Sequence, residues 1–205
     1  MMNSNVGFKG SLSTNLIKGE VDAPFLYHLK NRIAPRFWWN WLTYQSAKLF
    51  SEITNIITMT GSLSLVHIKE NGQRVNYGVV AYGLVTDAFV EFMVDQLQAE
   101  TSVWGDFKYH DSGVGITGAA VGDTDIETTD GESRATGSQT EGATAEIYKS
   151  VGTIAYTTTK AITEHGLFSA ATSVTLMDRH TFAAINVVNG DSIEFTYQLT
   201  CTSGG

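Results

Sequence analysis

The sequence is poor in cysteine and proline, with one and two residues respectively among 205. The lone Cys201 cannot form an internal disulfide, which fits assembly in a reducing cytosol. No stretch reaches 18 uninterrupted apolar residues, so we expect no membrane-spanning segment. The N-terminus, MMNSNVGFKG, also lacks the apolar core of a secretory signal. These absences exclude a disulfide-stapled scaffold and predict a protein without a membrane partner.

Positive charge is scarce in the second half of the chain. Residues 1–100 contain eight Lys/Arg and eight Asp/Glu, whereas residues 101–205 contain five and thirteen. The whole net charge of −8 therefore lies in the second half. Such a surface repels a phosphate backbone, so we expect no nucleic-acid partner.

Two strand-turn-strand patterns are the clearest local signals. From Ile193 onward apolar and polar residues alternate strictly, which is typical of a half-buried antiparallel strand. Asn189-Gly190 suits a tight turn and predicts a hairpin between residues 180–188 and 191–200. Asn71-Gly72 predicts a second hairpin between residues 53–68 and 74–85.

Helical patterns are confined to the first half. Pro35 disfavours helical geometry at the residue before it, so we expect one short helix before it and another over about 36–50. Residues 86–101 form the clearest helix, with Thr86 as N-cap and one apolar stripe. Helix signals end near 101–106, and short strands then recur about every ten residues. We therefore predict an α+β fold, with a mixed helix and hairpin region over 1–104 and a jelly-roll-like antiparallel β-sandwich over 105–205.

Residues that could carry chemistry are scattered. The five histidines lie singly along the chain, whereas metal ligands usually include pairs close in sequence. His165 beside Glu164, and the run Asp178-Arg179-His180, suggest catalysis or metal binding, but strand and loop positions explain them more simply. The sequence has no G-x-S-x-G motif, and the glycine-rich run 113–122 lacks the G-K-[ST] of a phosphate-binding loop. We expect no cofactor, metal or enzyme activity.

A cluster of aromatic residues after Pro35 has three interpretations. Trp38 and Trp39 lie about 100° apart around a helix, so both cannot occupy the centre of one stripe. A wide core face is one explanation, an anchor in a protein–protein interface is the second, and stacking on a sugar is the third. Leu167 and Phe168 must likewise point to opposite faces of a strand, so one of them meets a neighbouring element or subunit. The candidate interface residues are Trp38, Trp39, Trp41, Tyr44 and Phe168.

An ordered series of segments over residues 109–200 resembles a domain of tailed-bacteriophage structural proteins. The series is YHDSGVGITGAAVGDTDIET (109–128), ESRATGSQTEGATAEIYKSVGTIAYT (132–157), ITEHGLFSAA (162–171) and LMDRHTFAAINVVNGDSIEFTYQLT (176–200). The resemblance implies a virion structural protein, assembled in the host cytoplasm and located in the virion. Its partners would be the major capsid protein or other virion proteins, together with further copies of itself.

The expected function is that of a capsid decoration (cement) protein, which stabilises the head through protein–protein contacts. The alternatives are a tail or head-fibre protein that binds a host surface glycan, and a head–tail connector component.

Overall fold

A computed structural model describes residues 20–33, 35–54, 57–98, 107–172 and 175–202. Within these ranges the chain forms three helices, α1 (Phe25–Ile33), α2 (Pro35–Thr54) and α3 (Asp87–Gln98). It also forms ten strands, β1 (Val21–Asp22), β2 (Thr58–Ile68), β3 (Arg74–Val85), β4 (Tyr109–Gly113), β5 (Ala135–Thr136), β6 (Ser138–Glu141), β7 (Ile147–Ala155), β8 (Lys160–Phe168), β9 (Leu176–Val187) and β10 (Ser192–Thr202). The β-rich class predicted for the second half is confirmed, and the strands are mostly antiparallel.

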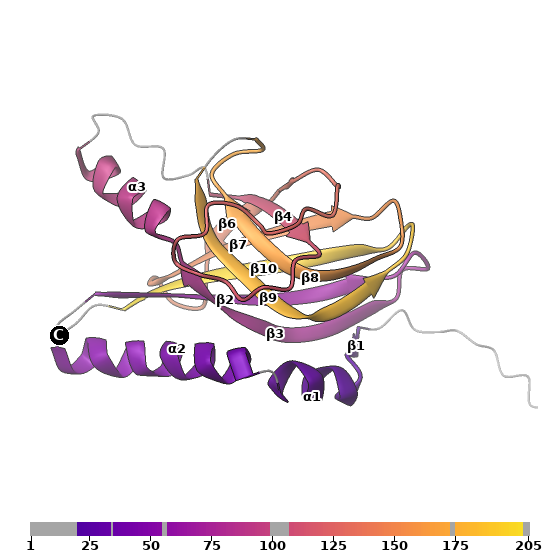
Figure 1. The fold of residues 1–205 in the computed structure, drawn as a ribbon, viewed down its shortest axis with the longest axis horizontal. Coiled ribbons are helices and arrows are strands. Elements are labelled where there is room, and N and C mark those ends of the chain that lie inside the picture. The colour runs from indigo at the N-terminus through magenta and orange to yellow at the C-terminus, as the bar shows by residue number, and fades with distance from the viewer. Residues whose placement is uncertain (1–19, 34, 55–56, 99–106, 173–174, 203–205) are drawn as a thin grey trace, which may run out of the picture.

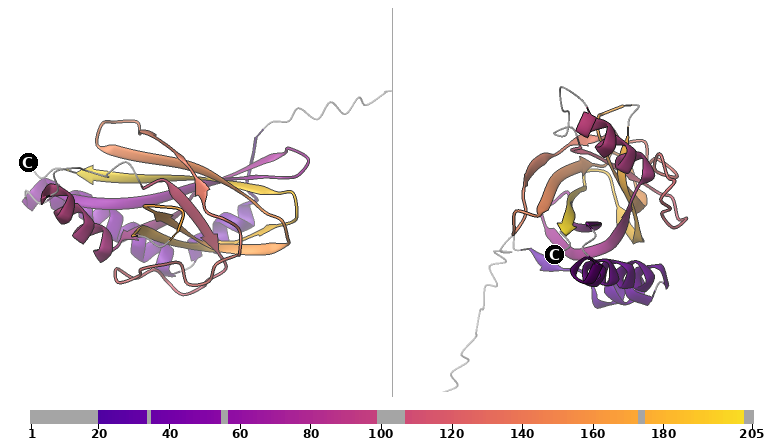
Figure 2. Two further views of the ribbon diagram at one scale, coloured as in Figure 1. Left: turned by 90° about the horizontal axis from the view of Figure 1, so that it is seen from above. Right: turned by 90° about the vertical axis from the view of Figure 1, so that its left-hand side faces the viewer.

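The strands form one sheet that nearly closes into a barrel. Their order is β5-β4-β8-β9-β3-β2-β10-β7-β6, with β1 paired to β3. The two ends of this order, β5 and β6, are separated only by Gly137, whose N–H donates to Lys108 O at 2.7 Å. The chain therefore brings β4 next to β7, and the end-on view shows the strands surrounding a common interior (Figure 2). A jelly-roll-like sandwich is not confirmed.

The barrel has two halves, which meet along two seams. The first half contains β1, β2, β3, β6, β7 and β10, and the second contains β4, β5, β8 and β9. At the first seam β3 and β9 pair only through Leu84 with Arg179 and Val85 with Asp178. At the second seam β4 approaches β7. The first seam thus has two residue pairs and no ladder is described at the second, whereas the long strands within each half pair over many residues.

One predicted hairpin is confirmed and the other is wrong. Strands β2 and β3 pair across Asn71-Gly72, where Gly72 has the positive φ of 80° that this turn requires. Asn189-Gly190 also makes a turn, with Gly190 at φ 90°, but the strands on either side do not pair. β9 pairs with β8 and β3, whereas β10 pairs with β2 and β7. The turn carries the chain from one half of the barrel to the other.

The predicted division into two domains does not describe the sheet. The proposed boundary itself lies in residues 99–106, outside the described residues. β2 and β3 from the first half of the chain nevertheless lie between β9 and β10 from the second half. One core contains side chains from both halves of the chain, including Leu63, Leu65, Phe182, Phe195 and Tyr197. The inward residues of β10 follow the predicted alternation, and Ile193, Phe195 and Tyr197 are fully buried.

Helices α1 and α2 run end to end along the outside of the barrel, below β3 in Figure 1. The predicted helices before and after Pro35 are confirmed. The predicted helix of residues 86–101 is confirmed as α3 as far as Gln98, and residues 99–101 lie outside the described residues. Thr86 caps α3, because its Oγ1 accepts the Phe89 N–H at 3.2 Å. Asn31 of α1 donates to Val80 O at 2.6 Å and accepts the Ala183 N–H at 3.1 Å. This buried amide bridges β3 and β9 where their ladder is missing.

Candidate functional site

The outward face of α1 and α2 is apolar. Residues on the opposite face of α2 contact the sheet: Phe37 and Tyr44 pack on Tyr82, and Asn40 donates to Tyr82 O at 2.9 Å. The side chains that turn away are large and exposed: Phe25 (76%), Leu26 (67%), Leu29 (41%), Ile33 (66%), Trp38 (49%), Trp39 (72%), Leu42 (53%) and Leu49 (57%). We call these eight residues the helical face.

The area of the helical face is large for a surface in contact with solvent. An aromatic side chain buries about 150–250 Å² when fully enclosed, so Phe25, Trp38 and Trp39 alone leave on the order of 400 Å² uncovered. Exposed apolar patches of several hundred Å² mark interaction sites. Residues 23–51 also contain Lys30, Arg32, Arg36 and Lys48 but no Asp or Glu. The segment that bears the helical face is therefore basic by composition, although the protein as a whole is acidic.

The predicted interface residues separate into three groups. Trp38 and Trp39 lie on the helical face, as the spacing argument required for at least one of them. Trp41 is half-buried beside Trp38, with ring centroids 5.6 Å apart, and Tyr44 is half-buried against Tyr82. Phe168 needs correction, because it is 1% exposed and has no surface for a partner. The guanidinium of Arg134 covers its ring at 3.5 Å. The neighbouring element that Phe168 meets is thus the loop before β5.

Two runs that suggested catalysis, 164–165 and 178–180, alternate between the two faces of the barrel wall. Glu164 and Arg179 point outward, beneath the long loop of residues 114–134, and pair through Arg179 Nε at 2.9 Å and Nη2 at 2.8 Å. His165, Asp178 and His180 are buried in the interior. Because strand side chains alternate, residues adjacent in sequence serve separate structures.

Glu164 anchors the long loop. Its carboxylate is fully buried and accepts the backbone N–H groups of Gly115 at 2.8 Å, Glu127 at 2.9 Å and Thr128 at 2.8 Å. Arg179 extends this network to Asp123 at 3.0 Å. One ion-pair network thus joins three segments of the resemblance, around Asp123, Glu164 and Arg179. Its hydrogen bonds hold the long loop against the barrel wall.

A row of polar side chains crosses the barrel interior. His110 Nε2 lies 2.9 Å from Ser150 Oγ, and His110 Nδ1 lies 2.9 Å from His165 Nε2. The ring of His180 follows, 6.0 Å from that of His165, and Tyr197 donates to Asp178 Oδ2 at 3.2 Å. Four atoms of this row have no hydrogen-bond partner among the described residues: His165 Nδ1, His180 Nδ1, His180 Nε2 and Asp178 Oδ1. We call His110, His165, His180 and Asp178 the interior row.

Burial sets the protonation of the interior row. Desolvation lowers the pKa of both His110 and His180 to about 3 and holds the pKa of His165 well below its usual value. Desolvation also raises the pKa of Asp178 well above its usual value. The three imidazoles are therefore uncharged at neutral pH, and burial favours the protonated, neutral form of Asp178.

Two glycines make room for the end of this row. A Cβ added to Gly61 would lie 1.8 Å from Asp178 Oδ2, and one added to Gly83 would lie 2.1 Å from Asp178 Oδ1 and 2.4 Å from His180 Nε2. Gly61 and Gly83 are register partners on β2 and β3. Two neighbouring strands thus omit their side chains where the carboxyl and imidazole groups of β9 enter.

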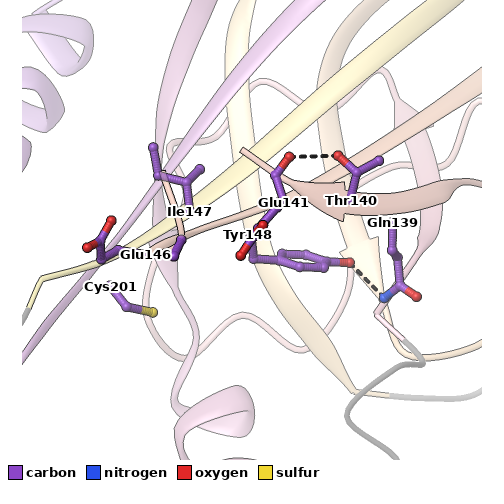
Figure 3. A pocket seen from close by; sticks show the side chains of 8 residues that line it. Gln139, Thr140, Glu141, Glu146, Ile147, Tyr148 and Cys201 are labelled. Atoms are coloured by element: carbon purple, nitrogen blue, oxygen red, sulfur yellow. Dashed lines mark hydrogen bonds between the residues drawn. The ribbon is translucent and has the colours of Figure 1, made fainter. Parts of the chain in front are cut away.

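A pocket of about 600 Å³ opens beside β6, β7 and the end of β10 (Figure 3). Tyr148 donates to Phe107 O at its wall, and Cys201 lines the opposite side. Burial raises the pKa of the Cys201 thiol, which keeps the sulfur protonated and poorly nucleophilic at neutral pH. The pocket brings no acid–base pair to this thiol among the residues that line it.

Sequence reasoning did not anticipate that three histidines meet in the interior. His110, His165 and His180 lie far apart in the chain, and only the pairing of β4, β8 and β9 brings them together. The alternation of ITEHG and MDRH between the two faces was the available signal. Within the described ranges no group of His, Cys, Asp or Glu side chains has the arrangement needed to hold a metal ion.

The chain matches no protein-family model, and neither a curated protein nor a solved structure is significantly similar to it. Among the described helices, none is long and apolar enough to cross a membrane.

Proposed function

We propose that the protein is a non-enzymatic structural component of a bacteriophage particle, and specifically a capsid decoration (cement) protein. The observation that supports this function best is the helical face, because Trp38, Trp39 and their apolar neighbours lie uncovered on the outside of the fold. The resemblance over residues 109–200 supplies the class of particle. The geometry of the described residues supports attachment better than it supports chemistry.

In this proposal the helical face docks on the major capsid protein, and the acidic barrel faces neighbouring subunits or solvent. Stable interfaces bury about 800 Å² on each partner. The aromatic part of the helical face supplies on the order of half of that area. Many such contacts across capsomer boundaries would oppose the pressure of packaged DNA mechanically.

Quantitative mass spectrometry of purified virions tests the location in the particle. A decoration protein is present in hundreds of copies, so a measured stoichiometry of a few copies per virion would exclude this role. A small copy number would instead favour the connector or fibre alternatives.

Binding to emptied, expanded capsids tests the surface. We expect Trp39→Ser and Leu42→Ser each to weaken binding at least about tenfold, as truncation of interface anchors usually does. Val188→Ser is the matched control, because Val188 is also exposed (48%) but lies in the turn between β9 and β10. Equal binding by all three variants would show that the helical face is not the docking surface.

One observation favours the glycan-binding alternative. Trp39 is 72% exposed, and an exposed indole offers a flat apolar surface on which a sugar ring stacks. The isolated protein should then bind host cells or purified surface glycans, and Trp39→Ser should abolish that binding. Under this alternative, Trp39→Ser would leave binding to emptied capsids unchanged.

A further inference from the structure

The three histidines of the interior row lie side by side on one half of the barrel. They belong to the adjacent strands β4, β8 and β9, and His165 is the register partner of His180. His110 and His165 are joined directly through their ring nitrogens, 2.9 Å apart. Each of the three rings is at most 1% exposed.

The interior row reaches the other half of the barrel at both seams. At the β4–β7 seam, His110 is linked to Ser150 of β7. At the β3–β9 seam, Asp178 lies over Gly61 and Gly83 and accepts the Tyr197 hydroxyl of β10. The two halves share little backbone pairing at the seams, so these side chains supply connections that a continuous ladder would otherwise supply.

We propose that the interior row is an acid-operated lock, which keeps the two halves of the barrel together while its imidazoles are uncharged and releases them at the seams when the imidazoles take up protons. Charge on His165 would face the rings of His110 and His180, whose centroids lie 5.1 Å and 6.0 Å from its own. The opposite half offers little compensation, because it presents Phe195, Ser150 and the Tyr197 hydroxyl. Within the row the carboxyl group of Asp178 lies beside His180, with Oδ1 3.7 Å from His180 Nδ1.

The direction of the effect follows from proton uptake. An unfolded histidine has a pKa of 6.5, whereas burial lowers the pKa of His110 and His180 to about 3 in the folded protein. The unfolded chain therefore binds more protons between these values, and stability falls as pH falls below 6.5. Asp178 acts oppositely, because its raised folded pKa adds stability below its unfolded value of 3.8 that is lost as pH rises.

Urea unfolding between pH 4 and 6 tests the lock. Each neutral buried imidazole should raise the unfolding equilibrium constant about tenfold per pH unit of acidification. A plot of the logarithm of this constant against pH should lose about one unit of steepness in His110→Gln and in His180→Gln. Asp178→Asn should make the plot steeper, because it removes a group that acts in the opposite direction. His28→Gln is the matched control, since His28 lies on α1 outside the barrel. If both His110→Gln and His180→Gln showed the same dependence of the unfolding equilibrium constant on pH as the parent protein, the proposal would be overturned.

Hydrogen exchange at pH 5 distinguishes a lock from general acid unfolding. Release at the seams predicts that backbone amides of β4 and β9 lose protection before those of β2 and β10. Simultaneous loss in all four strands would overturn the lock. The test does not involve the helical face, so it is independent of the capsid-binding experiment.

Discussion

Glu164 and His165 are neighbours in sequence, yet they take part in different structures. The Glu164 carboxylate lies outside the barrel wall and receives three backbone N–H groups from the long loop and two N–H groups from Arg179. His165 lies inside the wall, against Phe195. Strand alternation accounts for the separation. The adjacent polar residues of this strand therefore have two separate roles: Glu164 binds the loop outside the wall, and His165 belongs to the interior row.

Glu164→Gln should be strongly destabilising. A neutral amide leaves Arg179 buried without its closest carboxylate, and breaking a buried ion pair costs about 3–5 kcal/mol. Urea unfolding measures this loss in free energy, and hydrogen exchange should show earlier exchange at the Gly115 and Thr128 amides. Glu141→Gln makes the same chemical change at an exposed site on β6 and should leave the unfolding midpoint near that of the parent. Equal midpoints for both variants would contradict the anchoring role of Glu164.

At the scale of single elements, α1 contributes to the barrel wall as well as to its cover. Strands β3 and β9 form only two residue pairs, and beyond them no ladder joins the two strands. The Asn31 side chain enters the gap with a donor for Val80 O and an acceptor for the Ala183 N–H, so neither backbone group is left unpaired. The helix is thus connected to both sides of the seam.

Asn31→Ala should lower the free energy of unfolding by about 1–3 kcal/mol, because it leaves the buried Val80 carbonyl and the partly buried Ala183 N–H without partners. Asn40→Ala is the comparison, since Asn40 is only partly buried and makes one bond to Tyr82 O. Thermal or urea unfolding measures both changes. A loss for Asn40→Ala as large as that for Asn31→Ala would show that the bridge adds nothing beyond an ordinary helix contact.

Elements with a strong local signal could be predicted from the sequence, and their partners could not. Pro35, Thr86 and Asn71-Gly72 act through neighbouring residues, and each produced the expected break, cap or hairpin. Asn189-Gly190 gave the expected turn as well. The pairing of β9 and β10 depends on strands distant in the chain, because β2 and β7 occupy both edges of β10. Local turn chemistry contains no information about that competition.

The same limit applies to the candidate sites in the whole molecule. Trp38 and Trp39 could be proposed for an interface because the angle between adjacent helical residues is a local property. Phe168 could not be placed correctly, since the Arg134 side chain that covers it comes from a loop more than thirty residues earlier. The interior row likewise depends on the pairing of β4, β8 and β9, whose histidines are up to 70 positions apart in the chain.

Because one sheet joins both halves of the chain, neither half should fold alone. A fragment of residues 105–205 lacks β2 and β3, so one edge of β10 and the seam edge of β9 would be exposed without partners. Exposed apolar strand edges favour aggregation over folding. We expect this fragment to lack cooperative unfolding and dispersed NMR signals, and coexpression with residues 1–104 to restore both. A fragment of 105–205 that folds cooperatively by itself would show that the C-terminal strands can close without β2 and β3, and would support the two-domain interpretation of the sequence.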